Sequence, residues 1–302
     1  MAPADLPASL PLCVCLLLVS GFAQAGRLLV VPMDGSHWFT MQMVVEKLIH
    51  RGHEVVVVVP EVSWQLGKSL NLTVKTYSTS YTLEEFNCKF KYFSDTQWKD
   101  PEQRWLSLKT NSSIAFFKLL SSHCRSLFND KKLVEYLKQS SFDAVFLDPF
   151  EVCGLTVAKY LSLPSVIFSR YFFCYHLEAG SQCPSPLSYV PRLFSKFTDT
   201  MTFKERVSNL VFYMEERALC HYLFKTATDI ASEVLQTPVT MEDLFSQVSI
   251  WLLRTDFVLD FPRPVMPNMV FIGGINCQKR KTISKVHFLS LAHEERPGFR
   301  PP

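Results

Sequence analysis

The fold of this chain is decided by the stretch Val30-Val31-Pro32-Met33-Asp34-Gly35-Ser36-His37-Trp38-Phe39. The apolar run from 27 to 33 predicts a buried strand, and the residues after it predict a sharp turn. Apolar residues then recur at helical spacing, at Met41, Val44, Val45 and Leu48, which predicts an amphipathic helix. A strand that turns into a helix in this way would place His37 beyond the carboxyl end of the strand.

A second strand follows this helix. Gly52 stands where the helix should end, because glycine adopts the left-handed conformation of a C-terminal cap without steric cost. Val55 to Val59 are five consecutive valines, a run typical of a strand that is buried on both faces of a parallel sheet. Together these segments predict a βαβ unit with the usual right-handed crossover.

The alternation of strands and helices continues along the chain. We expect helices over 101–128, 131–138 and 148–161, and strands over 142–147 and 164–168. Such alternation predicts an α/β fold, in which a parallel sheet is flanked by helices in a Rossmann-like arrangement.

Two polar residues follow predicted strands of this sheet. His37 comes after the first strand and Asp148 directly after the strand at 142–147. Ligands of such sheets bind in the crevice beyond the carboxyl ends of the strands, so both side chains should face one crevice. A carboxylate beside an imidazole fixes its tautomer and stabilises the imidazolium, which would make His37 a general base.

Simpler interpretations of both residues stay open at this point. A histidine in a loop is often a surface or capping residue. Asp148 precedes Pro149 at a predicted helix start, the arrangement of an N-cap aspartate with proline in the first helical position. Spacing alone does not choose between these structural roles and catalysis.

The N-terminus has the pattern of a secretory signal peptide, which we assign to residues 1–25. A short apolar core from Leu10 to Val19 precedes Ala23-Gln24-Ala25, a small-x-small cleavage site. No later segment has the ~18 apolar residues that a spanning helix needs. The mature chain is therefore expected on the lumenal or secreted side.

Composition excludes one class of partner. The apolar fraction of 48%, with 25 Phe, can fill a sizeable core. Residues 278–302 hold six Lys or Arg and two Glu, a balance of +4, so the rest of a chain of net charge +3 carries about −1. Because the positive charge is confined to a short tail, we expect no nucleic-acid partner.

The cysteines and the sequons indicate possible covalent modifications. The mature chain keeps seven cysteines, at 88, 124, 153, 174, 183, 220 and 277. They lack zinc-site spacing, so no metal site is expected; some could pair in an oxidising lumen, or most could be buried free thiols. Asn71 and Asn111 stand in Asn-x-Ser/Thr sequons, and Asn111 is the weaker glycan site because it falls in a predicted helix.

Five segments carry a resemblance to a known family. They are Val31-Pro32-Met33-Asp34-Gly35-Ser36-His37-Trp38, Arg51-Gly52-His53-Glu54-Val55, Phe142-Asp143-Ala144-Val145-Phe146-Leu147-Asp148-Pro149-Phe150, Trp251-Leu252-Leu253-Arg254-Thr255-Asp256 and Val270-Phe271-Ile272-Gly273-Gly274-Ile275. Through them, residues 26–277 closely resemble the N-terminal half of the mammalian UDP-glucuronosyltransferases of the 1A family.

This resemblance implies a GT-B glycosyltransferase, of which 26–277 would be the Rossmann-like acceptor-binding domain. It implies that His37 deprotonates the hydroxyl of a small lipophilic acceptor and that Asp148 orients and charge-balances His37. The co-substrate would be UDP-glucuronic acid, with no bound cofactor or metal. Met33, Phe39 and Phe150 are the candidate acceptor contacts, and Asp143 is expected to be structural.

The resemblance also implies a place of action. Residues 187–235 are rich in apolar residues with interspersed basic ones, and Val207, Leu210, Val211, Met214 and Leu219 fall on one helical face. That face could pack on the core of the domain. The alternative, favoured by the resemblance, is a peripheral contact with the lumenal side of the endoplasmic reticulum membrane.

The resemblance stops at Cys277. Residues 278–302 are basic and Pro-rich, and we expect them to match nothing in these enzymes and to be disordered. We therefore expect the UDP-sugar-binding domain and the transmembrane helix of the family to be absent, in line with the lack of a phosphate-binding glycine loop in the sequence. An alternative function is therefore a catalytically silent form that binds or regulates full-length family members as a homo- or hetero-oligomer.

Overall fold

The computed structural model describes residues 25–64, 72–98 and 111–277, apart from 171, 173, 193, 194 and 259. The predicted signal peptide up to residue 24, the sequon at Asn71 and the tail 278–302 lie outside the described residues. Asn111 is the first residue of a helix, as expected.

The described residues build a seven-stranded, fully parallel sheet with the strand order β3-β2-β1-β4-β5-β6-β7. The strands are β1 (Arg27–Val31), β2 (Glu54–Pro60), β3 (Thr73–Tyr77), β4 (Ala144–Leu147), β5 (Ser165–Ser169), β6 (Val248–Leu253) and β7 (Met269–Phe271). The order reverses between β1 and β4, as in doubly wound sheets. The predicted Rossmann-like α/β fold is confirmed.

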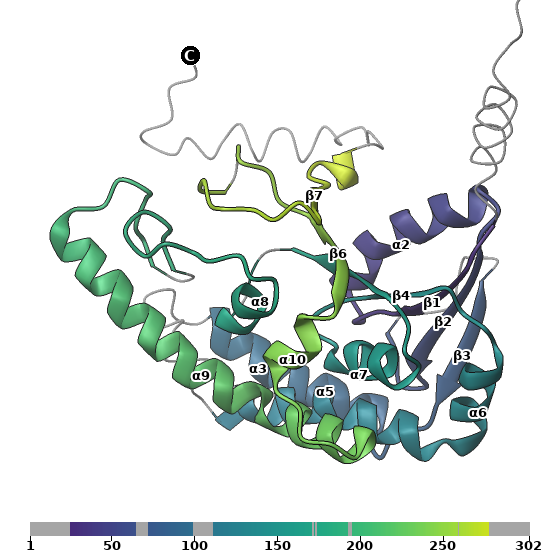
Figure 1. Ribbon diagram of the computed structural model, residues 1–302. Coiled ribbons are helices and arrows are strands. Elements are labelled where there is room, and N and C mark those ends of the chain that lie inside the picture. Colours follow the sequence, from purple (N-terminus) through teal and green to yellow (C-terminus); the bar gives the residue numbers. More distant parts are fainter. Residues whose placement is uncertain are drawn as a thin grey trace, which may run out of the picture.

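Helices lie on both faces of the sheet (Figure 1). They are α2 (Ser36–His50), α3 (Leu83–Trp98), α5 (Asn111–Asn129), α6 (Lys131–Gln139), α7 (Val152–Tyr160), α8 (Tyr175–Gly180), α9 (Phe203–Leu235) and α10 (Met241–Phe245), with a 3-10 turn η1 (Ile275–Cys277). In Figure 1, α2 lies above the sheet, and α5, α7 and α9 lie below it.

The run of valines in β2 shows why the central strands are mainly apolar. Val55, Val57 and Val59 belong to the core cluster on the α2 side, which also contains Trp38 and Met41. Val56 and Val58 belong to the cluster on the other side, with α5, α7 and α9. Because successive side chains point to opposite faces, a strand covered by helices on both faces has no solvent-exposed position. The prediction for 55–59 is confirmed.

Two predicted helix boundaries have different outcomes. Gly52 has φ of 91° directly after the cap residue of α2, so its role in ending this helix is confirmed. The helix expected from Asp148 begins only at Val152, after a cap at Glu151. The backbone N–H of Glu151 donates to the carbonyl oxygen of Asp148 at 3.1 Å, and Pro149 in the second position favours the turn that this bond closes. The N-cap role for Asp148 is therefore wrong.

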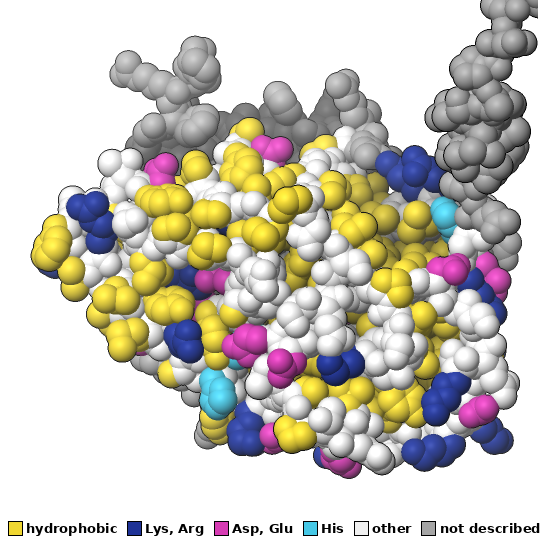
Figure 2. Space-filling model, in the orientation of Figure 1, with side chains coloured by type: hydrophobic (Ala, Val, Ile, Leu, Met, Phe, Trp, Pro, Cys, Tyr) yellow, Lys and Arg dark blue, Asp and Glu magenta, His cyan; other side chains and the backbone are white. Residues whose placement is uncertain are grey.

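The apolar residues of helix α9 are exposed in its first half and buried further along. Val207, Leu210, Val211 and Met214 are 47–64% exposed, whereas Leu219 is buried. Figure 2 shows hydrophobic side chains gathered at the left of the molecule, where the first half of α9 lies. Packing on the core is thus wrong for the four exposed residues, and membrane contact by them stays a prediction. Among the described residues, no helix combines the length and hydropathy needed to cross a membrane.

Four of the cysteines are paired. Cys124–Cys153 joins α5 to α7, and Cys174–Cys220 joins the start of α8 to α9. Cys88 and Cys277 are free and exposed, and Cys183 is free and buried. The expectation of mostly buried free thiols is therefore wrong, and the expectation of some disulfides is confirmed.

Candidate functional site

The register of two central strands brings His37 and Asp148 together. Val31 at the end of β1 lies beside Leu147 at the end of β4, and the N–H of Asp148 donates to the carbonyl oxygen of Val31 at 3.4 Å. Residues just beyond these two strand ends are therefore neighbours, although 111 positions separate them in the sequence.

The turn between β1 and α2 is fixed by its own side chains. Gly35 has φ of 72°, and a Cβ there would lie 3.2 Å from the ring of Trp64, so only glycine fits without strain. The carboxylate of Asp34 accepts the N–H groups of Gly35 and Trp64, both at 2.6 Å. Because this turn is tied down on both sides, α2 begins at Ser36 and holds His37 in its first turn.

The central feature of the site is a histidine–carboxylate pair. Nδ1 of His37 lies 2.7 Å from Oδ2 of Asp148, and their side chains are 16% and 3% exposed. An ionised carboxylate only accepts hydrogen bonds, so Nδ1 carries the proton and Nε2 keeps the free lone pair. The arrangement can therefore take up a proton at Nε2.

Asp148 is itself oriented by the turn that it begins. Its Oδ1 accepts the N–H of Phe150 at 2.9 Å, while Oδ2 faces His37. The ring of Phe150 packs edge-on against the imidazole, with 5.2 Å between ring centroids. The turn thus fixes the carboxylate and the rotation of the histidine ring together.

A cavity of about 290 Å³ opens beside this pair. Its walls are mainly apolar and aromatic, and Met33, His37 and Phe150 all line it. Phe39 does not: its side chain is 47% exposed on α2. Since residues two apart on a helix point about 200° from each other, Phe39 is directed away from the side of α2 that carries His37. The structure thus brings together every candidate site residue of this edge except Phe39.

Several lining residues were not expected from the sequence. They are chiefly aromatic residues of α3 and α5, together with a histidine and a glutamate, namely Phe86, Phe90, Phe93, Phe116, Phe117, His123 and Glu151. The available signal in the sequence was the high number of Phe residues between 86 and 117. In the structure these side chains pack against one another as a connected aromatic cluster. Asp143 is structural, as expected, because its Oδ2 accepts the N–H of Arg27 at 2.6 Å.

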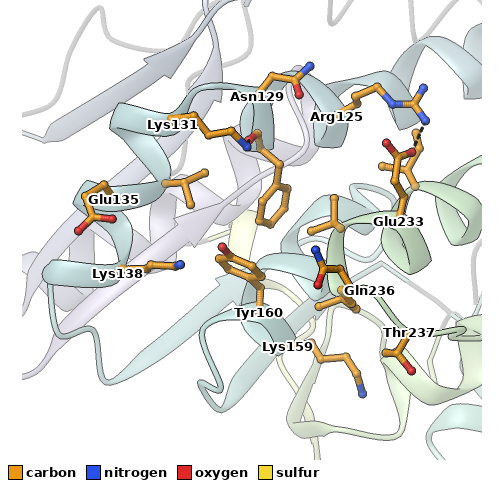
Figure 3. Close-up of a pocket in the computed structure, with 15 residues that line it drawn as sticks. Arg125, Asn129, Lys131, Glu135, Lys138, Lys159, Tyr160, Glu233, Gln236 and Thr237 are labelled. Carbon is orange, nitrogen blue, oxygen red and sulfur yellow. Dashed lines mark hydrogen bonds and ion pairs between the residues drawn. The ribbon is translucent and has the colours of Figure 1, made fainter.

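A larger hollow of about 780 Å³ lies elsewhere, between α5, α6, α7 and α9 (Figure 3). Lys138, Lys159 and Tyr160 line it, and they come shortly before β4 and β5, at the amino edge of the sheet. Figure 3 shows charged side chains around its opening, with Arg125 paired to Glu233. Neither His37 nor Asp148 lines this hollow, so size alone does not identify the reactive site.

Across the three described ranges, no group of three or more His, Cys, Asp or Glu side chains comes together in a way that could hold a metal ion. The described site consists of the His37–Asp148 pair and a mainly apolar pocket. Such a combination suits the deprotonation of a hydroxyl group on a lipophilic molecule.

Comparisons with known proteins agree with the geometry. A family model described as "UDP-glucoronosyl and UDP-glucosyl transferase" matches residues 26–291, so the match continues past Cys277, where we expected the resemblance to stop. The chain is 74% identical over 286 residues to UDP-glucuronosyltransferase 1A7 of Mus musculus and 68% identical over 283 residues to UDP-glucuronosyltransferase 1A10 of Homo sapiens. Both alignments cover 94% of this chain, and 54% and 53% of those proteins. The chain thus spans about half the length of the curated relatives it matches.

Among solved structures, the chain is similar to one titled "Crystal Structure Analysis of the Glycotransferase of kitacinnamycin". The TM-score is 0.48 at 12% identity, over 83% of this chain and 52% of that chain.

Proposed function

The chain belongs to the UDP-glucuronosyltransferase family, and from that premise we propose that it takes part in the transfer of glucuronic acid to a hydroxyl group of a small lipophilic acceptor, such as a phenol, a steroid or a foreign compound. UDP-glucuronic acid is the proposed donor. The lumenal side of the endoplasmic reticulum is the proposed place of action, with an exposed face of α9 toward the membrane.

The pair His37–Asp148 carries this proposal. The acceptor hydroxyl gives its proton to Nε2 of His37 as its oxygen bonds to the anomeric carbon of the sugar. The bond from that carbon to the UDP oxygen breaks on the opposite side, so UDP leaves with the electron pair and the configuration inverts. Asp148, 2.7 Å from Nδ1, stabilises the imidazolium that forms.

The cavity supports the acceptor class. A cavity of about 150 Å³ holds one benzene ring, so 290 Å³ leaves room for about two rings. Its aromatic walls would bury an apolar molecule, and its polar groups are few and fixed, as in most small-molecule sites. A one- or two-ring phenol therefore matches both the size and the chemistry of the pocket.

The experiment that tests the proposal compares the chain with its His37→Ala variant. Each is incubated with UDP-glucuronic acid and a phenol, and the conjugate is measured by mass spectrometry. General-base catalysis is worth about 10²- to 10⁴-fold, so we expect at least a hundredfold loss in the variant, while phenol binding measured by calorimetry changes little. Conjugate formation at equal, measurable rates by the two proteins would overturn the role of His37.

A second candidate function is to hold acceptors or to associate with full-length family members without transferring sugar. The observation that favours it is that described residues of this chain already form an acceptor-sized pocket beside His37. It predicts phenol binding without conjugate formation in the unaltered chain. Co-expression with a full-length enzyme should then change that enzyme's activity or its sedimentation, and no change in either would contradict this candidate.

A further inference from the structure

A second histidine–carboxylate pair lines the same pocket. Nδ1 of His123 on α5 lies 3.2 Å from Oε2 of Glu151 at the cap of α7, and both residues line the cavity beside His37. They are 5% and 6% exposed. A buried carboxylate in a mainly aromatic pocket is costly unless it is paired and hydrogen-bonded, so its presence there needs a reason.

One turn carries both carboxylates. Asp148 and Glu151 are the first and last residues of the turn that the bond between their backbones closes, so their Cα atoms lie within about 7 Å of each other. Asp148 faces His37, and Glu151 faces His123. The pocket therefore has two polar positions set by one rigid turn, with the ring of Phe150 in the same turn.

Tyr81 holds the pair of His123 and Glu151 in one orientation. The hydroxyl of Tyr81 contacts Nε2 of His123, so a chain runs from Tyr81 through His123 to Glu151. Burial raises the pKa of Tyr81 above its usual value, and the negative charge of Glu151 adds to that shift. Since this phenol keeps its proton, Tyr81 donates to Nε2 and His123 donates from Nδ1 to Glu151.

The hydrogen-bonded series from Tyr81 through His123 leaves Glu151 with unused acceptor capacity. A carboxylate has about four lone-pair positions, and among the described residues Glu151 accepts one side-chain hydrogen bond, at Oε2. The disulfide Cys124–Cys153 already ties α5 to α7 next to both residues, so the pair is not required to join the helices.

We propose that Glu151, oriented by His123, is a specificity-determining residue that binds a second hydroxyl group of the acceptor, distant from the hydroxyl that His37 deprotonates. The favoured acceptors are two-ring phenols with a hydroxyl group at each end. This inference rests on the proposed function of the pocket as an acceptor site. An acceptor without the second hydroxyl would bury Glu151 with its lone pairs unpaired, which weakens binding.

The test measures the affinity of the unaltered chain for three probes of nearly equal shape: 4,4′-biphenol, 4-phenylphenol and 4-hydroxy-4′-methoxybiphenyl. Trp64 lines the pocket, so its fluorescence can report binding without any sugar donor. Hydrogen bonds to charged groups are worth a factor of about 10 to 100 in affinity, so we expect biphenol to bind about 10 to 100 times more tightly than either of the other probes. Equal affinities for the three would overturn the inference.

The variant Glu151→Gln sharpens the test, with its melting temperature measured as a check on folding. We expect the preference for biphenol to fall at least fivefold, because the amide is a weaker acceptor than the carboxylate. The matched control is Glu242→Gln, which alters the pair of His176 and Glu242 at 2.9 Å, away from the pocket; the preference should stay unchanged there. A preference that survives Glu151→Gln would also overturn the inference.

The two proposals can fail separately. If none of the probes binds the unaltered chain, the pocket is not an acceptor site, and the proposed function and this inference fall together. If all three bind with equal affinity, the pocket holds phenols and only the role of Glu151 is refuted.

Discussion

The two edges of the sheet carry polar groups in contrasting ways. At the carboxyl edge, Asp148 and Glu151 are buried, and each is fixed to one histidine beside a pocket of about 290 Å³. At the amino edge, a hollow of about 780 Å³ is bordered by exposed or half-buried charges such as Lys138 and Glu135. Exposed ion pairs contribute little to stability and are screened by salt.

This difference teaches which cavity is chemically useful. The charged side chains of the larger hollow are held by exposed contacts, such as the Arg125–Glu233 ion pair, and solvent competes with these contacts. The smaller pocket removes its polar groups from water and orients them, which strengthens every electrostatic interaction with a bound molecule. If this reasoning is right, conservative changes at the carboxyl edge should have large functional effects and changes at the amino edge should not.

The largest expected effect is that of Asp148→Asn. The amide can donate a hydrogen bond to Nδ1 of His37, which would move the imidazole proton to Nε2 and remove the base. The equivalent loss of tautomer control in serine proteases lowers kcat by about 10⁴-fold. We expect a fall of about 10³- to 10⁴-fold in conjugate formation, measured with UDP-glucuronic acid and a phenol.

The control for this variant lies at the other edge. Lys159→Ala removes a charge from the wall of the larger hollow and should leave the rate of conjugate formation and the affinity for phenols unchanged. If Lys159→Ala lowered the rate as much as Asp148→Asn does, the contrast between the two edges would be wrong.

The strands that form the carboxyl edge could be predicted from the sequence, because their buried positions accept only apolar residues. The valines at 55–59 and the apolar residues of 142–147 identified strands, because a strand covered on both faces admits little else. Two strands of one parallel sheet then put His37 and Asp148 at the same edge. That part of the site needed only local patterns and one general property of the fold.

Other parts depended on contacts that local patterns do not contain. Asp148-Pro149 suits both a helix start and a turn, and the hydrogen bonds of this aspartate to His37 and Phe150 accompany the turn. Glu151 and His123 were missed because each looks like an ordinary polar residue of a helix until α5 and α7 are brought together. The sequence also gives no clear signal for β3, whose residues Thr73–Tyr77 are largely polar and partly exposed.

A second prediction concerns the packing beneath the Asp148–Glu151 turn. Gly154 of α7 lies so close to the sheet that a Cβ would be 2.8 Å from the Cβ of Leu147 and 3.4 Å from that of Val31. Gly154→Ala should push α7 away from the strand ends that place His37 and Asp148. Overpacking of this kind costs about 1–3 kcal/mol, which a urea titration would measure, and conjugate formation should fall with it.

Lys159→Ala is the matched control here too, since it lies on the same helix. Its free energy of unfolding should stay within about 0.5 kcal/mol of the unaltered chain, as for most surface substitutions. Equal stability of Gly154→Ala and the unaltered chain would mean that α7 adjusts without strain, and the carboxyl edge would then be less rigid than its contacts imply.

The smallest expected effect comes from the amino edge, where Thr240 caps α10 shortly before β6. Its hydroxyl accepts the N–H of Asp243 at 3.1 Å, and the carboxylate of Asp243 accepts the hydroxyl and the N–H of Thr240 at 2.7 and 2.8 Å. Loss of such a cap costs about 0.5–2 kcal/mol, so Thr240→Ala should lower the free energy of unfolding by that amount and leave phenol binding unchanged.

The cap also makes the free energy of unfolding depend on pH in the acid range. The hydrogen bonds from the side chain and the N–H of Thr240 lower the pKa of Asp243 below its usual value of 3.8. A lowered carboxyl pKa stabilises the fold above the unfolded value, and that stabilisation is lost as the pH falls through the folded value. Urea titrations from pH 6 to pH 2 should therefore show the unaltered chain and Thr240→Ala converging below about pH 4. A constant difference across that range would show that Asp243 does not depend on this cap, and that the amino edge holds its charges even more loosely than its contacts indicate.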